Sequence, residues 1–78
     1  CKIANSTEFG LQSGVGTNNL DNIKYCIKHL KVGAVNINEG PPHDMPNIPF
    51  GGVKQSGVGR EGIRYAMQEM TYIKCVVM

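Results

Sequence analysis

The sequence predicts an α/β fold in which strands alternate with two helices. After Asn18, apolar residues recur three and four positions apart, which is typical of an amphipathic helix. Apolar and polar residues alternate over 34–38, and the last eight residues, TYIKCVVM, are rich in β-branched and aromatic side chains. The expected order is therefore strand, helix, strand, long loop, helix, strand.

The first half of the chain should hold a strand and a complete helix. Residues 1–5 resemble the tail of a helix, and 8–17 form a short run that suits a strand. Thr17 and Asn18 are candidates for the N-cap of the helix that follows. Its apolar stripe would consist of Leu20, Ile23, Cys26, Ile27 and Leu30.

In the second half, Gly33 should stop the first helix before the strand over 34–38. The next stretch, GPPHDMPNIPFGGVKQSG, carries all four prolines of the chain, so we expect a long, stiffened loop without regular structure. Loops of such length inside compact domains tend to be functional. A second helix should run from Arg60 to Met70, and a strand should follow over 71–78.

The chain has 78 residues, fewer than the roughly 100 to 200 of a self-sufficient α/β enzyme domain. It starts at Cys1 and stops directly after an apolar run, so we expect a piece of a longer protein. The net charge of +2 is spread along the sequence and indicates neither a nucleic-acid nor a membrane partner. No signal-peptide core is visible, and a cytoplasmic location is the expectation.

The three cysteines, Cys1, Cys26 and Cys75, are an odd number and lie far apart in the sequence. They lack metal-ligand spacing, so neither a disulfide framework nor a zinc site is predicted. Their favoured interpretation is small apolar residues in a reducing compartment. A catalytic thiol is the alternative, although no neighbouring residue in the sequence would activate one.

The stretch GVGREG, residues 57–62, has the glycine spacing of a dinucleotide-binding loop. Such a loop needs a buried strand before it and an acidic residue about 20 positions further on. GGVKQS is no buried strand, and the acidic position would fall beyond Met78. Glu61 would also repel an anion at the start of the helix. We therefore predict turns at these glycines and no cofactor-binding residue in the chain.

The longer string PFGGVKQSGVGREG, residues 49–62, resembles the C-terminal signature of the aldehyde dehydrogenase superfamily. The flanking segments IANSTEFGLQSGV, VGAVNIN and EMTYIK are similar to segments of the same family, so the resemblance covers essentially the whole chain. Within the superfamily, the sequence looks most like the non-phosphorylating glyceraldehyde-3-phosphate dehydrogenases and lactaldehyde dehydrogenases. The matching positions of the signature are Pro49, Phe50, Gly51, Gly52, Lys54, Ser56, Gly57, Gly59, Arg60, Glu61 and Gly62.

The resemblance implies a parent enzyme that oxidises an aldehyde to its carboxylic acid with NAD or NADP. The family's cofactor site, Cys nucleophile and Glu base would lie upstream, so the 78 residues alone should be inactive and should hold no catalytic or metal-binding residue. Residues 1–70 would be the end of the catalytic domain, including a substrate-entrance loop over 39–59. Residues 71–78 would be an oligomerisation strand in a homodimer or homotetramer.

The resemblance also implies roles for individual residues. Phe50 would contact the aldehyde, and Pro42 and His43 would lie in the loop that selects it. His43 stands where the phosphate-recognising branch tends to carry Arg, which leaves recognition of a substrate phosphate open. Gly16 departs from the bulky apolar residue usual in the family, which should weaken the strand and leave a gap. The residues expected to position the loop are Asn38, Gly51, Gly52, Lys54 and Ser56.

The alternative is a stand-alone small α/β module that binds a partner and has no enzymatic activity. Its C-terminal stretch YIKCVVM is apolar enough to pair with another strand. Such a module should be soluble, monomeric and cooperative in its unfolding, whereas a piece of a larger domain should be molten or should aggregate.

Overall fold

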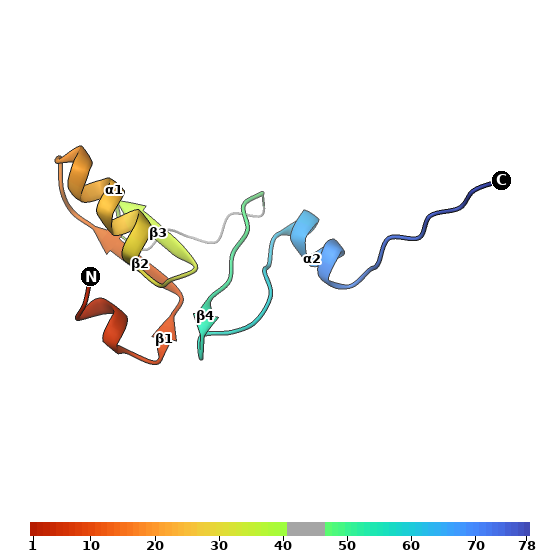
Figure 1. Ribbon diagram of the computed structural model, residues 1–78, viewed down its shortest axis with the longest axis horizontal. Helices are drawn as coiled ribbons and strands as arrows, with labels where there is room; N and C mark the ends of the chain where they lie inside the picture. The colour runs from red at the N-terminus through yellow and green to blue at the C-terminus, as the bar shows by residue number, and fades with distance from the viewer. Residues whose placement is uncertain (41–46) are drawn as a thin grey trace.

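A computed structural model of the protein describes residues 1–40 and 47–78 and shows a mixed α/β chain (Figure 1). This confirms the predicted α/β class at its coarsest level. The elements in chain order are η1 (Ala4–Ser6), β1 (Phe9–Gly10), β2 (Gln12–Val15), α1 (Leu20–His29), β3 (Ala34–Ile37), β4 (Val53–Lys54) and α2 (Ile63–Glu69).

The strands β2 and β3 form a parallel pair, and α1 makes the connection between them. The register places Gln12 opposite Ala34 and Val15 opposite Ile37. Parallel strands cannot be joined by a tight turn, so a crossover helix is the usual solution. The alternating and helical patterns of this region thus combine into one strand, helix, strand unit. Gly16 lies just beyond the end of β2, and nothing lies within 4 Å of a Cβ added there, which agrees with the gap expected from the sequence.

The N-cap of α1 lies one residue after Asn18, the second of the two predicted cap residues. Asn19 is the N-cap, and its side-chain oxygen accepts a hydrogen bond from the backbone N–H of Asn22 at 3.1 Å. Thr17 instead accepts a hydrogen bond from the N–H of Asn19 at 3.1 Å. The helix ends at His29 with Leu30 as C-cap, three residues before Gly33, so Gly33 is not the residue that stops it.

The segment predicted to be wholly irregular contains a short strand. β4 pairs antiparallel with β1, with Phe9 opposite Lys54 and Gly10 opposite Val53. A further isolated bridge joins Phe50 and Glu61. The prediction was wrong here because a two-residue strand is formed by a partner some 44 positions away and leaves no periodic pattern of its own.

The second helix is shorter than predicted, and the C-terminal strand is not formed within the chain. The Phe50 to Glu61 bridge keeps the backbone extended up to Glu61, so α2 begins only at Ile63, after Gly62 with a φ of 105°. Residues 71–78 are exposed and are not assigned to a strand, and they run away from the rest of the molecule (Figure 1). A strand requires a hydrogen-bonding neighbour. The start of the chain is likewise a single 3-10 turn, η1, not the end of an α-helix.

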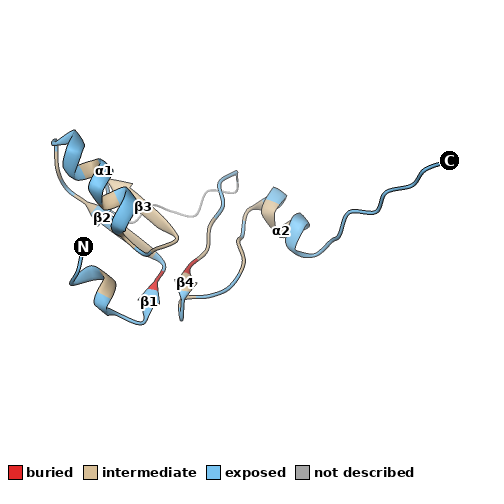
Figure 2. Cartoon of the chain, in the orientation of Figure 1, coloured by how far each residue is buried: buried red, intermediate tan, exposed pale blue. Residues whose placement is uncertain are grey.

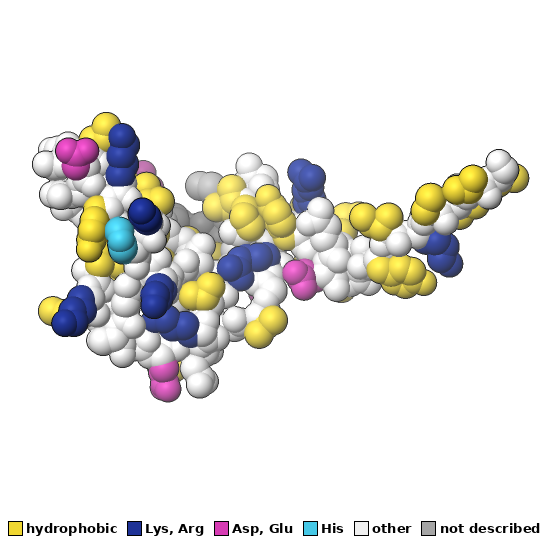
Figure 3. Space-filling view, viewed as in Figure 1, with side chains coloured by type: hydrophobic (Ala, Val, Ile, Leu, Met, Phe, Trp, Pro, Cys, Tyr) yellow, Lys and Arg dark blue, Asp and Glu magenta, His cyan; other side chains and the backbone are white. Residues whose placement is uncertain are grey.

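No apolar side chain is buried in the described part of the chain. The two buried residues of that part are glycines: Gly10 lies in β1, and Gly52 lies next to β4 (Figure 2). The radius of gyration is 15.7 Å, well above the roughly 12 Å of a compact domain of this length. Apolar side chains cover α2 and the 71–78 segment (Figure 3). Among the described helices, none is long and apolar enough to cross a membrane.

Candidate functional site

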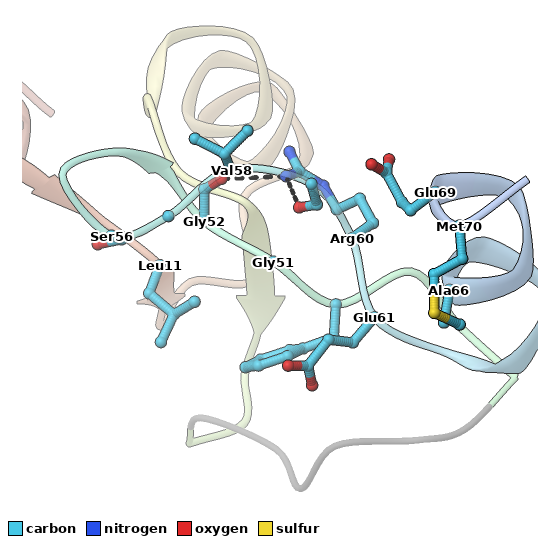
Figure 4. A pocket seen from close by; sticks show the side chains of 13 residues that line it. Leu11, Gly51, Gly52, Ser56, Val58, Arg60, Glu61, Ala66, Glu69 and Met70 are labelled. Carbon is cyan, nitrogen blue, oxygen red and sulfur yellow. Dashed lines mark hydrogen bonds between the residues drawn. The ribbon is translucent and has the colours of Figure 1, made fainter.

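An open cleft of about 440 Å³ lies between the glycine-rich segment 50–61 and α2 (Figure 4). Phe50 and Glu61, which form an isolated backbone bridge, line it, and Arg60 lies beside them. Glu69 and Met70 line it from the end of α2. The cleft therefore combines an aromatic ring, a guanidinium group and two carboxylates with an apolar thioether.

Three neighbouring residues attach the glycine-rich segment to the N-terminal part of the chain. The hydroxyl of Ser56 accepts a hydrogen bond from the N–H of Gly10 at 2.8 Å. The N–H of Gln55 donates to the carbonyl of Glu8 at 3.0 Å. Lys54 has a φ of 55°, and its Nζ donates to the carbonyls of Asn5 at 3.2 Å and Thr7 at 3.1 Å. These contacts hold the turn after β4 against a segment more than 40 positions earlier in the chain.

Arg60 forms hydrogen bonds within the glycine-rich segment and holds its two ends together. Its Nη1 donates to the carbonyl of Gly52 at 3.0 Å and to that of Gly59 at 2.7 Å. Phe50 and Glu61 exchange two backbone hydrogen bonds, of 3.1 and 2.5 Å. Because the guanidinium group is a planar donor with fixed geometry, it fixes the spacing of the two backbone stretches next to the Phe50 to Glu61 bridge.

The glycines of the segment are required by close backbone approaches. A Cβ on Gly52 would lie 2.5 Å from the Cβ of Ser56. A Cβ on Gly51 would overlap the carbonyl of Gly59, and a Cβ on Gly33 would overlap the carbonyl of Gly51. The segment thus packs directly against the connection between α1 and β3, with backbone touching backbone.

Asn38 lies at the end of β3 with a φ of 57°, and its amide binds the backbone of Thr17. The Oδ1 atom accepts from the Thr17 N–H at 2.9 Å, and Nδ2 donates to the Thr17 carbonyl at 3.0 Å. The amide therefore ties the start of the loop to the β2–α1 connection. Pro42 and His43, which were predicted together with Phe50 as substrate-binding residues, lie outside the described residues.

The stretch GVGREG does not fit a dinucleotide. The segment before Gly57 is a turn that follows the two-residue strand β4. Glu61 stands at the entrance of α2, and α2 has only seven residues. Both features oppose binding of a pyrophosphate at this helix start. These features favour turns at the glycines over a cofactor-binding loop.

The described walls of the cleft hold no cysteine and no cluster of side chains that could bind a metal ion. None of the three cysteines lines it. Over residues 1–40 and 47–78, no group of three or more His, Cys, Asp or Glu side chains could hold a metal ion. The cleft offers binding and positioning contacts.

The family follows from comparison of the sequence with protein-family models. The model of the aldehyde dehydrogenase family matches residues 1–76. The chain belongs to the aldehyde dehydrogenase family. This confirms the resemblance predicted from PFGGVKQSGVGREG and its flanks.

Relatives in the aldehyde dehydrogenase family include enzymes with small oxygenated or sulfonated aldehydes in their names. The chain is 50% identical over 76 residues to a sulfoacetaldehyde dehydrogenase from Neptuniibacter caesariensis, covering 97% of the chain and 17% of that protein. It is 47% identical over 76 residues to a lactaldehyde dehydrogenase from Methanocaldococcus jannaschii, covering 97% and 16%.

A solved structure agrees with these relatives. The glyceraldehyde-3-phosphate dehydrogenase GapN from Methanocaldococcus jannaschii, crystallised with NADP, superposes with a TM-score of 0.89 at 49% identity. The superposition covers 94% of this chain and 16% of that one. The chain therefore spans about one sixth of the length of the aldehyde dehydrogenases it matches.

Sequence reasoning missed Glu69 and Gly33 as residues of the site. Glu69 lines the cleft, and its carboxylate lies beside Gly59, where an added Cβ would be 3.3 Å from Oε2. A charged residue on an exposed helix carries no signal in a single sequence. Gly33 was interpreted as the residue that ends the first helix, so its contact with Gly51 was not considered.

Proposed function

We propose that the chain is the C-terminal part of an NAD(P)-dependent aldehyde dehydrogenase that oxidises an aldehyde to its carboxylic acid. In this proposal the chain supplies the substrate-entrance loop over 39–59 and contacts between subunits. The Cys nucleophile, the Glu base and the cofactor site belong to the upstream part of a cytoplasmic homodimer or homotetramer.

The single observation that carries the proposal is the family match over 76 of the 78 residues, which includes the whole signature segment. The relatives are dehydrogenases of sulfoacetaldehyde and lactaldehyde by name, so a short polar aldehyde is the proposed substrate class. Solved family members contain NADP or NAD, which supports either nicotinamide cofactor.

The chain's own contribution to the reaction would be positional. When bound, the nicotinamide accepts hydride from the aldehyde carbon. Phe50 presents its half-buried ring to the cleft, and Arg60 and the Phe50 to Glu61 bridge hold that ring in place. A rigid wall lowers the entropy cost of orienting the aldehyde and excludes water from it.

A chimeric enzyme tests the proposal. Residues 1–76 replace the matching segment of the Neptuniibacter caesariensis sulfoacetaldehyde dehydrogenase, and NAD(P)H formation with sulfoacetaldehyde is followed by absorbance. We expect kcat/KM within about tenfold of the unaltered relative, because the packing contacts of the family are kept. The control is the relative lacking the segment, which should be inactive. A folded, correctly assembled chimera without activity would overturn the proposal.

A further inference from the structure

Two of the three cysteines lie next to each other in space. The Sγ atoms of Cys1 and Cys26 are 3.7 Å apart, although the residues are 25 positions apart in the sequence. Both are free thiols, Cys1 is exposed and Cys26 is partly exposed. Cys75, also free, lies in the 71–78 segment.

A hydrogen-bonded clamp accounts for this proximity. Asn5 donates from Nδ2 to the carbonyl of His29 at 2.7 Å and accepts at Oδ1 from the N–H of Lys31 at 2.8 Å. The N–H of Asn5 also donates to the carbonyl of Cys1 at 2.8 Å. One asparagine thus holds the Cys1 turn against the last turn of α1, where Cys26 lies three residues before His29.

We infer that Cys1 and Cys26 form a reversible dithiol–disulfide site. A disulfide requires the two sulfurs to approach from 3.7 Å to about 2.05 Å. This goes beyond the proposed dehydrogenase function and does not depend on it. The oxidant is a low-molecular-weight disulfide of the glutathione class.

The exchange balances in two steps. The Cys1 thiolate attacks one sulfur of glutathione disulfide, forms a mixed disulfide and releases one glutathione thiolate. The Cys26 thiolate then attacks the Cys1 sulfur and releases the second glutathione. The two cysteines lose two electrons and two protons in total, and one glutathione disulfide becomes two glutathione molecules.

The bond would connect the segment just before η1 covalently to α1, across the interface that Asn5 already clamps. That interface leads through Lys31 to Gly33, which packs against Gly51 of the cleft. In the oxidised chain, the disulfide would hold this interface together even without the Asn5 hydrogen bonds. The glycine-rich segment that packs on Gly33 would then stay in place.

The test is the equilibrium between the chain and glutathione, measured for the Cys75→Ser variant by thiol counting and peptide mapping. Trypsin cuts after Lys2, Lys24 and Lys28, so the disulfide joins peptides 1–2 and 25–28. The equilibrium constant in native buffer is compared with that in concentrated guanidinium chloride. We expect a native value at least about tenfold higher, and a fall toward the denatured value in Asn5→Ala but not in Asn18→Ala.

When peptide mapping is done on the wild-type chain, which keeps Cys75, the disulfides that form are compared with those expected from an unfolded chain. In an unfolded chain, loop closure favours the Cys1–Cys26 pair over Cys26–Cys75 only about threefold. Since no apolar side chain is buried in the part of the chain that the structure describes, the mapping is repeated in the chimeric enzyme, whose activity need not be intact. The equilibrium constant for disulfide formation could be the same in native buffer and in guanidinium chloride, both for the isolated chain and for the chimeric enzyme. That result would overturn the inference. A native value at least about tenfold higher in either protein supports it.

Discussion

Within these 78 residues, Phe50 is the one whose side chain the proposed reaction uses most directly. It is half-buried in the cleft wall, between Pro49 and the backbone of Gly51. In the chimeric enzyme, Phe50→Ala should raise KM about tenfold and lower kcat less, because a positioning contact mainly affects binding. The assay is steady-state NAD(P)H formation over a range of aldehyde concentrations.

The matched control for that variant is Phe9→Ala, which removes the other phenylalanine of the chain. Phe9 lies in β1 and is 54% exposed, and it does not line the cleft. We expect KM to stay unchanged in the control. If Phe50→Ala lowered kcat by the same factor by which it raised KM, a positioning role would be contradicted.

Gly33 and Gly16 give opposite expectations for the same substitution. Gly33→Ala places a methyl group into the Gly51 carbonyl, and overpacking of this kind costs about 1 to 3 kcal/mol. Gly16 has no neighbour within 4 Å of an added Cβ, so Gly16→Ala should be neutral or stabilising by about 0.5 kcal/mol. Thermal unfolding of the two chimeric variants measures both, and equal melting temperatures would refute the close contact.

The signature residues could be identified from the sequence alone, whereas the Gly33 contact and the Asn19 cap could not. The signature residues were found because their identities and spacing are specific. The contact of Gly33 with Gly51 could not be found, because it joins two loops that only the folded backbone brings together. Asn19 was passed over for Thr17 and Asn18, since all three can cap a helix and the choice depends on backbone geometry.

Among the elements, α1 agrees most closely with its pattern. Its apolar stripe predicted a helix from Leu20, and the structure has Leu20–His29. β4 and the 71–78 segment agree least, because a strand exists only through its hydrogen-bonding partner. β4 finds a partner in β1, and 71–78 finds none within the described chain. The predicted oligomerisation role of 71–78 stays a prediction.

The start of α1 is testable through its cap. Asn19→Ala removes the acceptor for the Asn22 N–H and should cost about 1 kcal/mol of stability. Asn19→Asp keeps an acceptor at the same place and should cost less. Thermal unfolding of the chimeric enzyme ranks the variants. An Asn18→Ala loss as large as that of Asn19→Ala would contradict the assigned cap.

At the scale of the whole molecule, residues 1–40 and 47–78 do not form the core that a stand-alone domain requires. No apolar side chain is buried in the described residues, whereas Ile73 and Val77 are about nine-tenths exposed or more. Small domains owe most of their stability to burial of such side chains. These observations favour a part of a larger enzyme over an independent binding module.

The isolated 78-residue chain should therefore unfold without a cooperative transition. We expect a broad thermal profile by circular dichroism and binding of a hydrophobic dye, as for a loosely packed state. Insertion into the chimeric enzyme should restore a sharp transition. A monomeric chain that melts sharply on its own would instead favour the independent module.

The most direct test of membership in a longer enzyme is the coding sequence around Cys1, read together with the intact mass of the protein in its source. The relatives predict a reading frame that continues upstream into a Cys nucleophile, a Glu base and a cofactor-binding strand, loop and helix. The mass should then be about sixfold the 8.5 kDa of these residues. A start codon directly before Cys1, with a product of that smaller mass, would contradict the proposed dehydrogenase.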